Sequence, residues 1–146
     1  MLTPEEIQAA IILLMKSQPQ LVSAVQEEIR EDNWMGRDFD YPCYRVALGN
    51  LSPATNGECR LKILDIAFSV YCFAEGTSSK HAAYLAGLAM NNLMGKQIRY
   101  SDQSGPRIIP VSRIDIPTNG VVAPVPEGER LWRSEVQFIS TIKEVG

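Results

Sequence analysis

The hydrophobic pattern is clearest between residues 58 and 95, where a strand pattern passes into a helix pattern. From residue 62 on, every second position is apolar, which is the period of a strand with one buried face. These positions are Leu64, Ile66, Phe68, Val70 and Cys72. A turn-forming cluster, Glu75–Ser79, then precedes a helix that we expect to reach about Met94, with Gly95 just past its C-terminus. Apolar residues recur along this helix at helical spacing: Ala82, Leu85, Ala86, Ala89 and Leu93. We expect this stripe to pack on the Leu64–Cys72 face.

Two helices are predicted before this unit. Thr3-Pro4-Glu5-Glu6 has the form of a capping box, in which Thr3 caps the helix and Glu6 is its reciprocal partner. That helix should run to about Lys16. Pro19 can open a second helix, which we expect to reach about Arg30 with Ile29 on its inner face. The very short connection makes the pair a helical hairpin.

The remaining segments are predicted as strands and loops. Strands are expected at 41–49, 58–73, 98–100, 107–116 with an interruption at Pro110, and 129–143; loops are expected at 31–41, 50–57, 101–106 and 117–128. Hairpin-connected strands with helices collected on one side predict an α+β fold. We therefore expect an antiparallel sheet of about four to five strands, with the N-terminal helical hairpin and the central helix packed on it. Residues 1–146 should form a single domain.

Charge is divided unevenly along the chain. The formal net charge is -3, which gives the whole molecule no excess positive charge for binding nucleic acid. Residues 1–40 hold eight acidic and three basic side chains, a net of -5, whereas residues 41–146 hold nine and eleven, a net of +2. Such a division is typical of a solvated helix end. Alternatively, it allows one face of a molecule to attract the opposite face of a neighbouring copy.

Cysteine usage and the apolar segments bear on the cellular compartment. Cys43, Cys59 and Cys72 form no CxxC pair, and an odd number leaves one over in any disulfide scheme. We expect buried free thiols and hence a reducing compartment. Residues 7–15 are apolar but too short to span a bilayer, and acidic residues precede them, so neither a membrane segment nor a signal peptide is predicted. The protein should be cytosolic when made.

The sequence offers little support for an enzyme. His81 is the single histidine, and no cysteine or second histidine lies near it at ligand spacing, so no metal site is predicted. Asp38 and Asp40 could form a carboxylate pair, but a solvated turn explains them better. Phosphate-binding glycine loops and nucleophile-elbow motifs are not present. We therefore expect neither catalytic nor cofactor-binding residues, and no cofactor.

A second class of function is a small binding module for single-stranded nucleic acid. Basic residues gather in the last third of the chain, with an aromatic residue among them that could stack on a base. The residues that would carry this activity are Arg107, Arg113, Arg130 and Trp132. Acidic residues alternate with them, however, and cross-strand ion pairs on a solvated sheet face explain the same pattern.

The order of these segments resembles the tail terminator (tail completion) proteins of long-tailed bacteriophages. After the N-terminal helices, the stretches that carry the resemblance are Tyr41–Gly49, Leu64–Cys72, Glu75–Leu93 and Glu129–Phe138. Each stretch is weakly specific alone, and their order and spacing over most of the chain carry the comparison. The segment between Gly95 and Glu129 departs from the family pattern, which leaves the type of tail open.

The resemblance implies a structural virion protein of the tail or neck. Members of the family form a ring, usually a hexamer, that ends polymerisation of the tail tube and joins the tail to the head–tail connector. DNA passes through such a ring without being read. Another neck or head-completion protein is a close alternative. Ten residues are candidates for contacts with other subunits or with an adjoining ring: Glu27, Glu28, Glu31, Asp32, Trp34, Arg107, Val121, Val122, Arg130 and Arg133.

Overall fold

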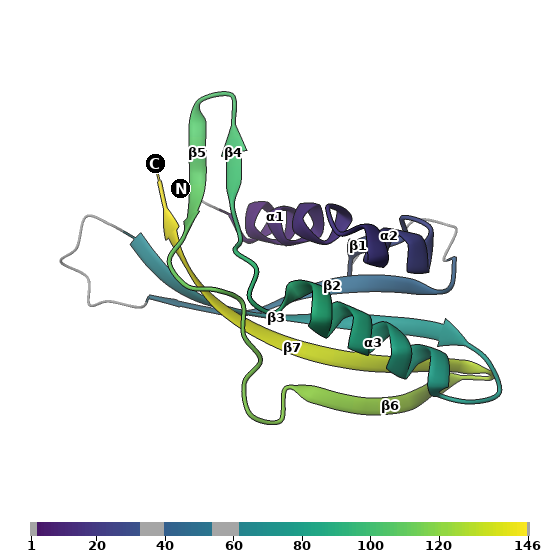
Figure 1. Ribbon diagram of the computed structural model, residues 1–146. Helices are drawn as coiled ribbons and strands as arrows, with labels where there is room; N and C mark the ends of the chain where they lie inside the picture. The colour runs from purple at the N-terminus through teal and green to yellow at the C-terminus, as the bar shows by residue number, and fades with distance from the viewer. Residues whose placement is uncertain (1–2, 33–39, 54–61, 146) are drawn as a thin grey trace.

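The computed structural model describes residues 3–32, 40–53 and 62–145, and over these ranges it is an α+β structure with three helices and a seven-stranded sheet (Figure 1). The elements in chain order are α1 (Pro4–Lys16), α2 (Pro19–Val25), β1 (Ile29–Glu31), β2 (Cys43–Pro53), β3 (Lys62–Glu75), α3 (Lys80–Leu93), β4 (Tyr100–Asp102), β5 (Gly105–Pro110), β6 (Val121–Gly128) and β7 (Leu131–Glu144). The sheet order is β1-β2-β3-β7-β5-β4, and β6 also pairs with β7.

Two long antiparallel strands, β3 and β7, form the centre of the sheet and pair along their whole lengths, from Lys62 opposite Glu144 to Glu75 opposite Leu131. The other edge of β7 is divided between two strands. β6 pairs with its first half and β5 pairs with its last residues. β7 therefore sets the register of both C-terminal hairpins.

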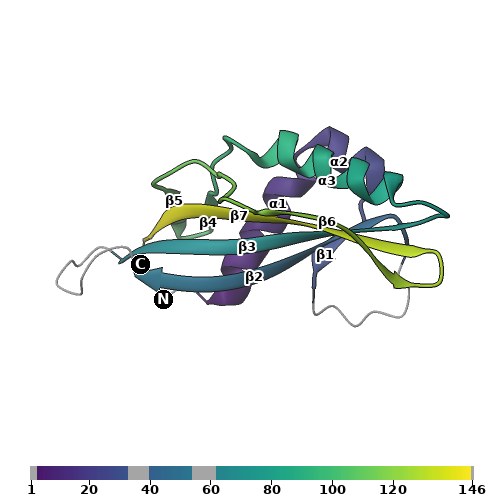
Figure 2. The same ribbon diagram turned by 90° about the horizontal axis from the view of Figure 1, so that it is seen from below.

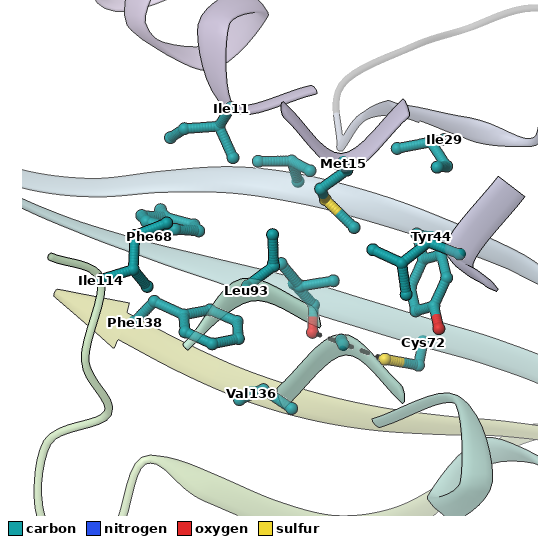
Figure 3. Packing of buried hydrophobic residues seen from close by; sticks show 14 of the residues in the cluster. Ile11, Met15, Ile29, Tyr44, Phe68, Cys72, Leu93, Ile114, Val136 and Phe138 are labelled. Carbon is teal, nitrogen blue, oxygen red and sulfur yellow. Dashed lines mark hydrogen bonds between the residues drawn. The ribbon is translucent and has the colours of Figure 1, made fainter. Parts of the chain in front are cut away.

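All three helices lie on one face of the sheet, and Figure 2 shows α1 passing behind the strands. Their buried residues form a single cluster with alternate residues of the strands, because a strand directs every second side chain to the same face. The rings of Phe68 and Phe138 stack within this cluster, with 5.2 Å between their centroids (Figure 3). The predicted packing of the α3 stripe is confirmed, since all five of its residues are buried there together with Phe68.

Helix boundaries follow the predicted signals in two of the three helices. The Thr3 hydroxyl accepts a hydrogen bond from the Glu6 amide at 3.3 Å, as an N-cap does. α3 ends at Leu93, and Gly95 has a left-handed φ of 79°, which a residue after a helix C-terminus commonly adopts.

The second helix is shorter than predicted. It stops at Val25, and the next two residues have left-handed backbone angles. Ile29 is buried as expected, but it belongs to β1, which runs parallel to β2. The sheet is therefore mixed, and its seven strands exceed the predicted four to five. Pairing with Tyr44 buries Ile29 without a helix, so tertiary contacts override the local helix propensity.

Residues 117–128, predicted as a loop, include the strand β6. Pro124 and Pro126 lie in this strand, which is an edge of the sheet, where a missing N–H breaks no ladder bond. The strand of 107–116 is also revised, because β5 ends at Pro110.

Candidate interaction surfaces

The face of the sheet opposite the helices carries no helix or strand within the described ranges, and we call it the open face. The register of β2, β3 and β7 places one set of alternating side chains on it. They include Ala47, Asp65, Ala67, Ser69, Tyr71, Arg133, Glu135, Gln137, Ile139 and Thr141. Arg45 and Cys43 belong to the same set by register, but both are buried. Two ends of this face differ in chemistry.

At the end near the β6–β7 hairpin, polar groups of the open face are bonded to one another. The Glu135 carboxylate accepts hydrogen bonds from the Ser69 hydroxyl at 2.9 Å and from the Gln137 amide at 3.2 Å. Arg133 forms an ion pair with Glu127 at 2.9 Å, and its guanidinium lies 5.3 Å from the centroid of the Tyr71 ring. This end therefore has few polar groups left to bind a ligand.

Toward the other end, the open face is hollowed. One hollow of about 540 Å³ lies between the end of β2, β3, β7 and residues 112–115, with Asp65, Ala67 and Ile139 among its lining residues. A smaller one of about 280 Å³ adjoins it on Ala67 and Ile139 and extends to Pro117. The Asp65 carboxylate accepts a hydrogen bond from the Thr141 hydroxyl at 2.7 Å. Ile139 remains 41% exposed, which is unusual for a residue at the centre of a sheet.

The predicted acidic contact residues lie around β1, but one of them has an internal role. Glu28 lies 3.3 Å from Arg45 and 3.4 Å from Arg30, and its side chain is largely buried. Glu27 and Asp32 are exposed, whereas Glu31 is half-buried in β1. Trp34 lies outside the described residues. Glu28 therefore joins Arg30 of β1 to Arg45 of β2 through two ion pairs. A contact role for the other acidic residues stays a prediction.

The predicted basic and apolar contact residues lie at both ends of the molecule. Arg107 joins two elements of its own chain, because it is 3.0 Å from Asp102 and 3.5 Å from Glu6 of α1. Val121 and Val122 are exposed on β6, and Arg130 is exposed in the β6–β7 turn. Their roles in assembly stay predictions, and Arg107 already takes part in two ion pairs within its own chain.

Of the residues of the alternative nucleic-acid site, Arg130 and Trp132 lie at the same end of the molecule, in the β6–β7 turn and at the start of β7, whereas Arg107 and Arg113 lie elsewhere. Trp132 is partly buried, and its indole donates a hydrogen bond to the Gly76 carbonyl at 3.2 Å. Arg113 donates a hydrogen bond to the Gly95 carbonyl at 2.8 Å, beyond the C-terminus of α3. Arg107 pairs with α1 near the far end of β7. These residues therefore form no shared stacking surface.

The two described cysteines, Cys43 and Cys72, are free and buried, as expected, while Cys59 lies outside the described residues. Burial raises the pKa of the Cys43 thiol to about 11, and it also raises the pKa of Cys72. His81 is exposed on α3. Within the described ranges, no group of three His, Cys, Asp or Glu side chains is arranged to hold a metal ion, and no helix has the length and apolar character needed to cross a membrane.

Comparison with known proteins shows a similarity in fold to solved structures. No protein-family model and no curated protein matches this sequence. One similar solved structure is a chain of the particle described as "Virion of native gene transfer agent (GTA) particle". The superposition has a TM-score of 0.62 with 14% sequence identity, and it covers 94% of this chain and 94% of that chain. At this identity, the likeness shows that the two chains share a fold.

Proposed function

We propose that this protein is a structural subunit of a phage-like virion, and that it acts there as a tail terminator. In this role, copies of the chain form a ring, with six as the expected number, on the end of the tail tube. The ring ends tube polymerisation and binds the head–tail connector, and DNA passes through it without being read.

The observation that carries the proposal is the end-to-end match in fold to a chain of a gene transfer agent virion. Coverage of 94% on both sides means that the shared fold spans almost the whole of each matched chain. The sequence resemblance to tail terminators is independent of this match, because it rests on the order of motifs. Fold alone does not determine function, so the assignment needs a direct test.

The test removes the protein from a particle-producing strain and examines the particles by electron microscopy. We expect tails of uncontrolled length that are not joined to heads. Adding the purified protein to an extract of that strain should restore joining, and an antibody label should lie at the head-proximal end of the tail.

Two results would contradict the proposal in different ways. Joined tails of normal length in the absence of the protein would exclude any role in completing the tail. Tails of normal length that fail to join heads would exclude termination and would instead indicate another neck protein.

A further inference from the structure

We propose that the tip of the β4–β5 hairpin is a movable arm, and that Glu6 of α1 holds it in place through Arg107. The arm consists of residues 101–107. Glu6 has a second potential partner, the Thr3 amide at the start of its own helix, so its carboxylate can hold the arm or release it. The inference goes beyond the proposed function and does not depend on it.

The arm makes few contacts with the rest of the molecule. Among the described strands, β4 pairs with β5 alone, and β5 pairs with β7 through Ile108–Pro110, which follow the arm. Five of the seven arm residues are exposed. Figure 1 shows the hairpin projecting past α1. A segment with little buried surface opens more readily than the core does.

The base of the hairpin is fixed, in contrast to the arm. Tyr100 lies opposite Ile108, and both pack in or against the hydrophobic cluster. The Arg107 carbonyl accepts a hydrogen bond from the Val145 amide at 3.0 Å, also at the base. The register of the hairpin is irregular between Tyr100 and Ser101, and an irregularity of this kind disrupts pairing and bends a strand. Movement about this point leaves the core packing intact.

The Arg107 guanidinium joins the arm to α1. One of its nitrogens is 3.5 Å from the Glu6 carboxylate, and another is 3.0 Å from the Asp102 carboxylate within the arm. Hydrogen bonds from the Ser104 hydroxyl and amide, together with Arg107, hold the pKa of Asp102 below its usual value, so this carboxylate stays ionised. Arg107 therefore keeps its partner inside the arm, and Glu6 is the partner that release removes.

The held position is only weakly favoured. The side chains of Glu6 and Arg107 are 33% and 25% exposed, and an ion pair at such positions shifts an equilibrium by about fivefold at most. The Arg107 Nε atom is buried without a hydrogen-bond partner in the described part of the chain. Burial of an unpaired N–H group opposes the held position by a comparable factor.

Glu6 also has an alternative to Arg107. Thr3 and Glu6 have the spacing of a capping box, and half of the box is formed, because the Glu6 amide donates to the Thr3 hydroxyl at 3.3 Å. Among the described residues, the other half is not formed, since the Glu6 carboxylate lies against Arg107 and not on the Thr3 amide. On release, Glu6 can complete the box, which offsets the loss of the ion pair.

The test measures amide hydrogen exchange of the arm by NMR in the full chain. The variants are Glu6→Gln, Arg107→Gln and the double substitution. Glu5→Gln is the matched control, because Glu5 lies in the same helical turn, is exposed and makes no ion pair within the described ranges. It changes the charge of the helix start equally. Circular dichroism establishes that each variant is folded.

We expect each single variant to exchange about two- to fivefold faster in the arm, as the loss of a partly exposed ion pair does. The double variant should exchange no faster than the faster single variant, because both remove the same contact. Glu5→Gln should match the wild-type protein. Unchanged exchange in the folded single variants would overturn the inference, and so would additive effects in the double variant.

A second measurement tests the alternative partner of Glu6. We expect the Thr3 amide resonance of Arg107→Gln to follow the ionisation of the Glu6 carboxylate as pH is changed, since a new hydrogen bond joins the two groups. In the wild-type protein and in Glu6→Gln it should not. A Thr3 amide that ignores Glu6 in Arg107→Gln would show that the released carboxylate does not complete the capping box, and this outcome would overturn the two-partner arrangement.

Discussion

At the scale of single residues, Gly120 is the position where the fold tolerates a side chain least. Its amide donates to the Pro117 carbonyl at 2.9 Å, and its carbonyl accepts from the Gln137 amide at 2.6 Å. A Cβ atom there would lie 2.7 Å from Ile116 Cγ2 and 2.9 Å from the Pro117 carbonyl oxygen. We predict that Gly120→Ala lowers the free energy of unfolding by about 1–3 kcal/mol, measured by urea denaturation, because the backbone has to move.

Gly87 provides the matched control. It lies in α3, where an added Cβ would meet nothing within 4 Å, so Gly87→Ala should raise the free energy of unfolding by about 0.5–1 kcal/mol through its effect on the unfolded chain. Equal effects of the two substitutions would show that the contacts around Gly120 are not strained. The sequence predicts only a loop at 117–128, because it does not show that residues 115 and 120 bond to β7.

At the scale of elements, one hydrogen bond fastens the central helix to the sheet. The Tyr44 hydroxyl on β2 donates to the Leu85 carbonyl of α3 at 2.8 Å, and Tyr44 is completely buried. We predict that Tyr44→Phe lowers the free energy of unfolding by about 1 kcal/mol, because the ring still packs while a buried hydrogen bond is lost. The measurement is again urea denaturation.

Tyr71→Phe is the control for this substitution. Tyr71 lies on the open face, and its hydroxyl makes no hydrogen bond to any residue in the described part of the chain. Its removal should change stability by less than about 0.5 kcal/mol, as surface substitutions usually do. If both variants lost the same stability, the Tyr44–Leu85 hydrogen bond would make no measurable contribution to the packing of α3 on the sheet.

The sequence predicts best those elements in which the hydrophobic period repeats often enough to distinguish a strand from a helix. β3 alternates over many residues and α3 repeats its stripe over several turns, so both were predicted correctly. β1 has three residues, and only its partner Tyr44 distinguishes it from the end of a helix. β6 reads as a loop because its prolines are acceptable only at an edge, and a sequence does not show which strand is an edge.

At the scale of the whole molecule, the open face could not be predicted, because the pairing of β3 with β7 determines which side chains lie on it. Ile139 reads as an ordinary strand residue, and only its pairing opposite Ala67, on the side away from the helices, exposes it. The predicted acidic residues were chosen from net charge along the chain. The net charge of a segment does not show that Glu28 forms an ion pair with Arg45, seventeen residues further along the chain.

The same large-scale arrangement predicts that the protein does not bind single-stranded nucleic acid. Trp132 pairs with Ala74 at one end of β7, whereas the Arg107 carbonyl accepts from the Val145 amide just beyond the other end. At about 3.3 Å per residue, β7 separates these two positions by roughly 40 Å, so they cannot contact the same few nucleotides. We expect a short fluorescent oligonucleotide to show no saturable binding at micromolar protein concentrations in low salt. Binding that weakens as salt rises, and that Arg113→Gln or Arg130→Gln reduces, would instead show that assembly or rearrangement brings these arginines together, because such salt dependence reports phosphate contacts.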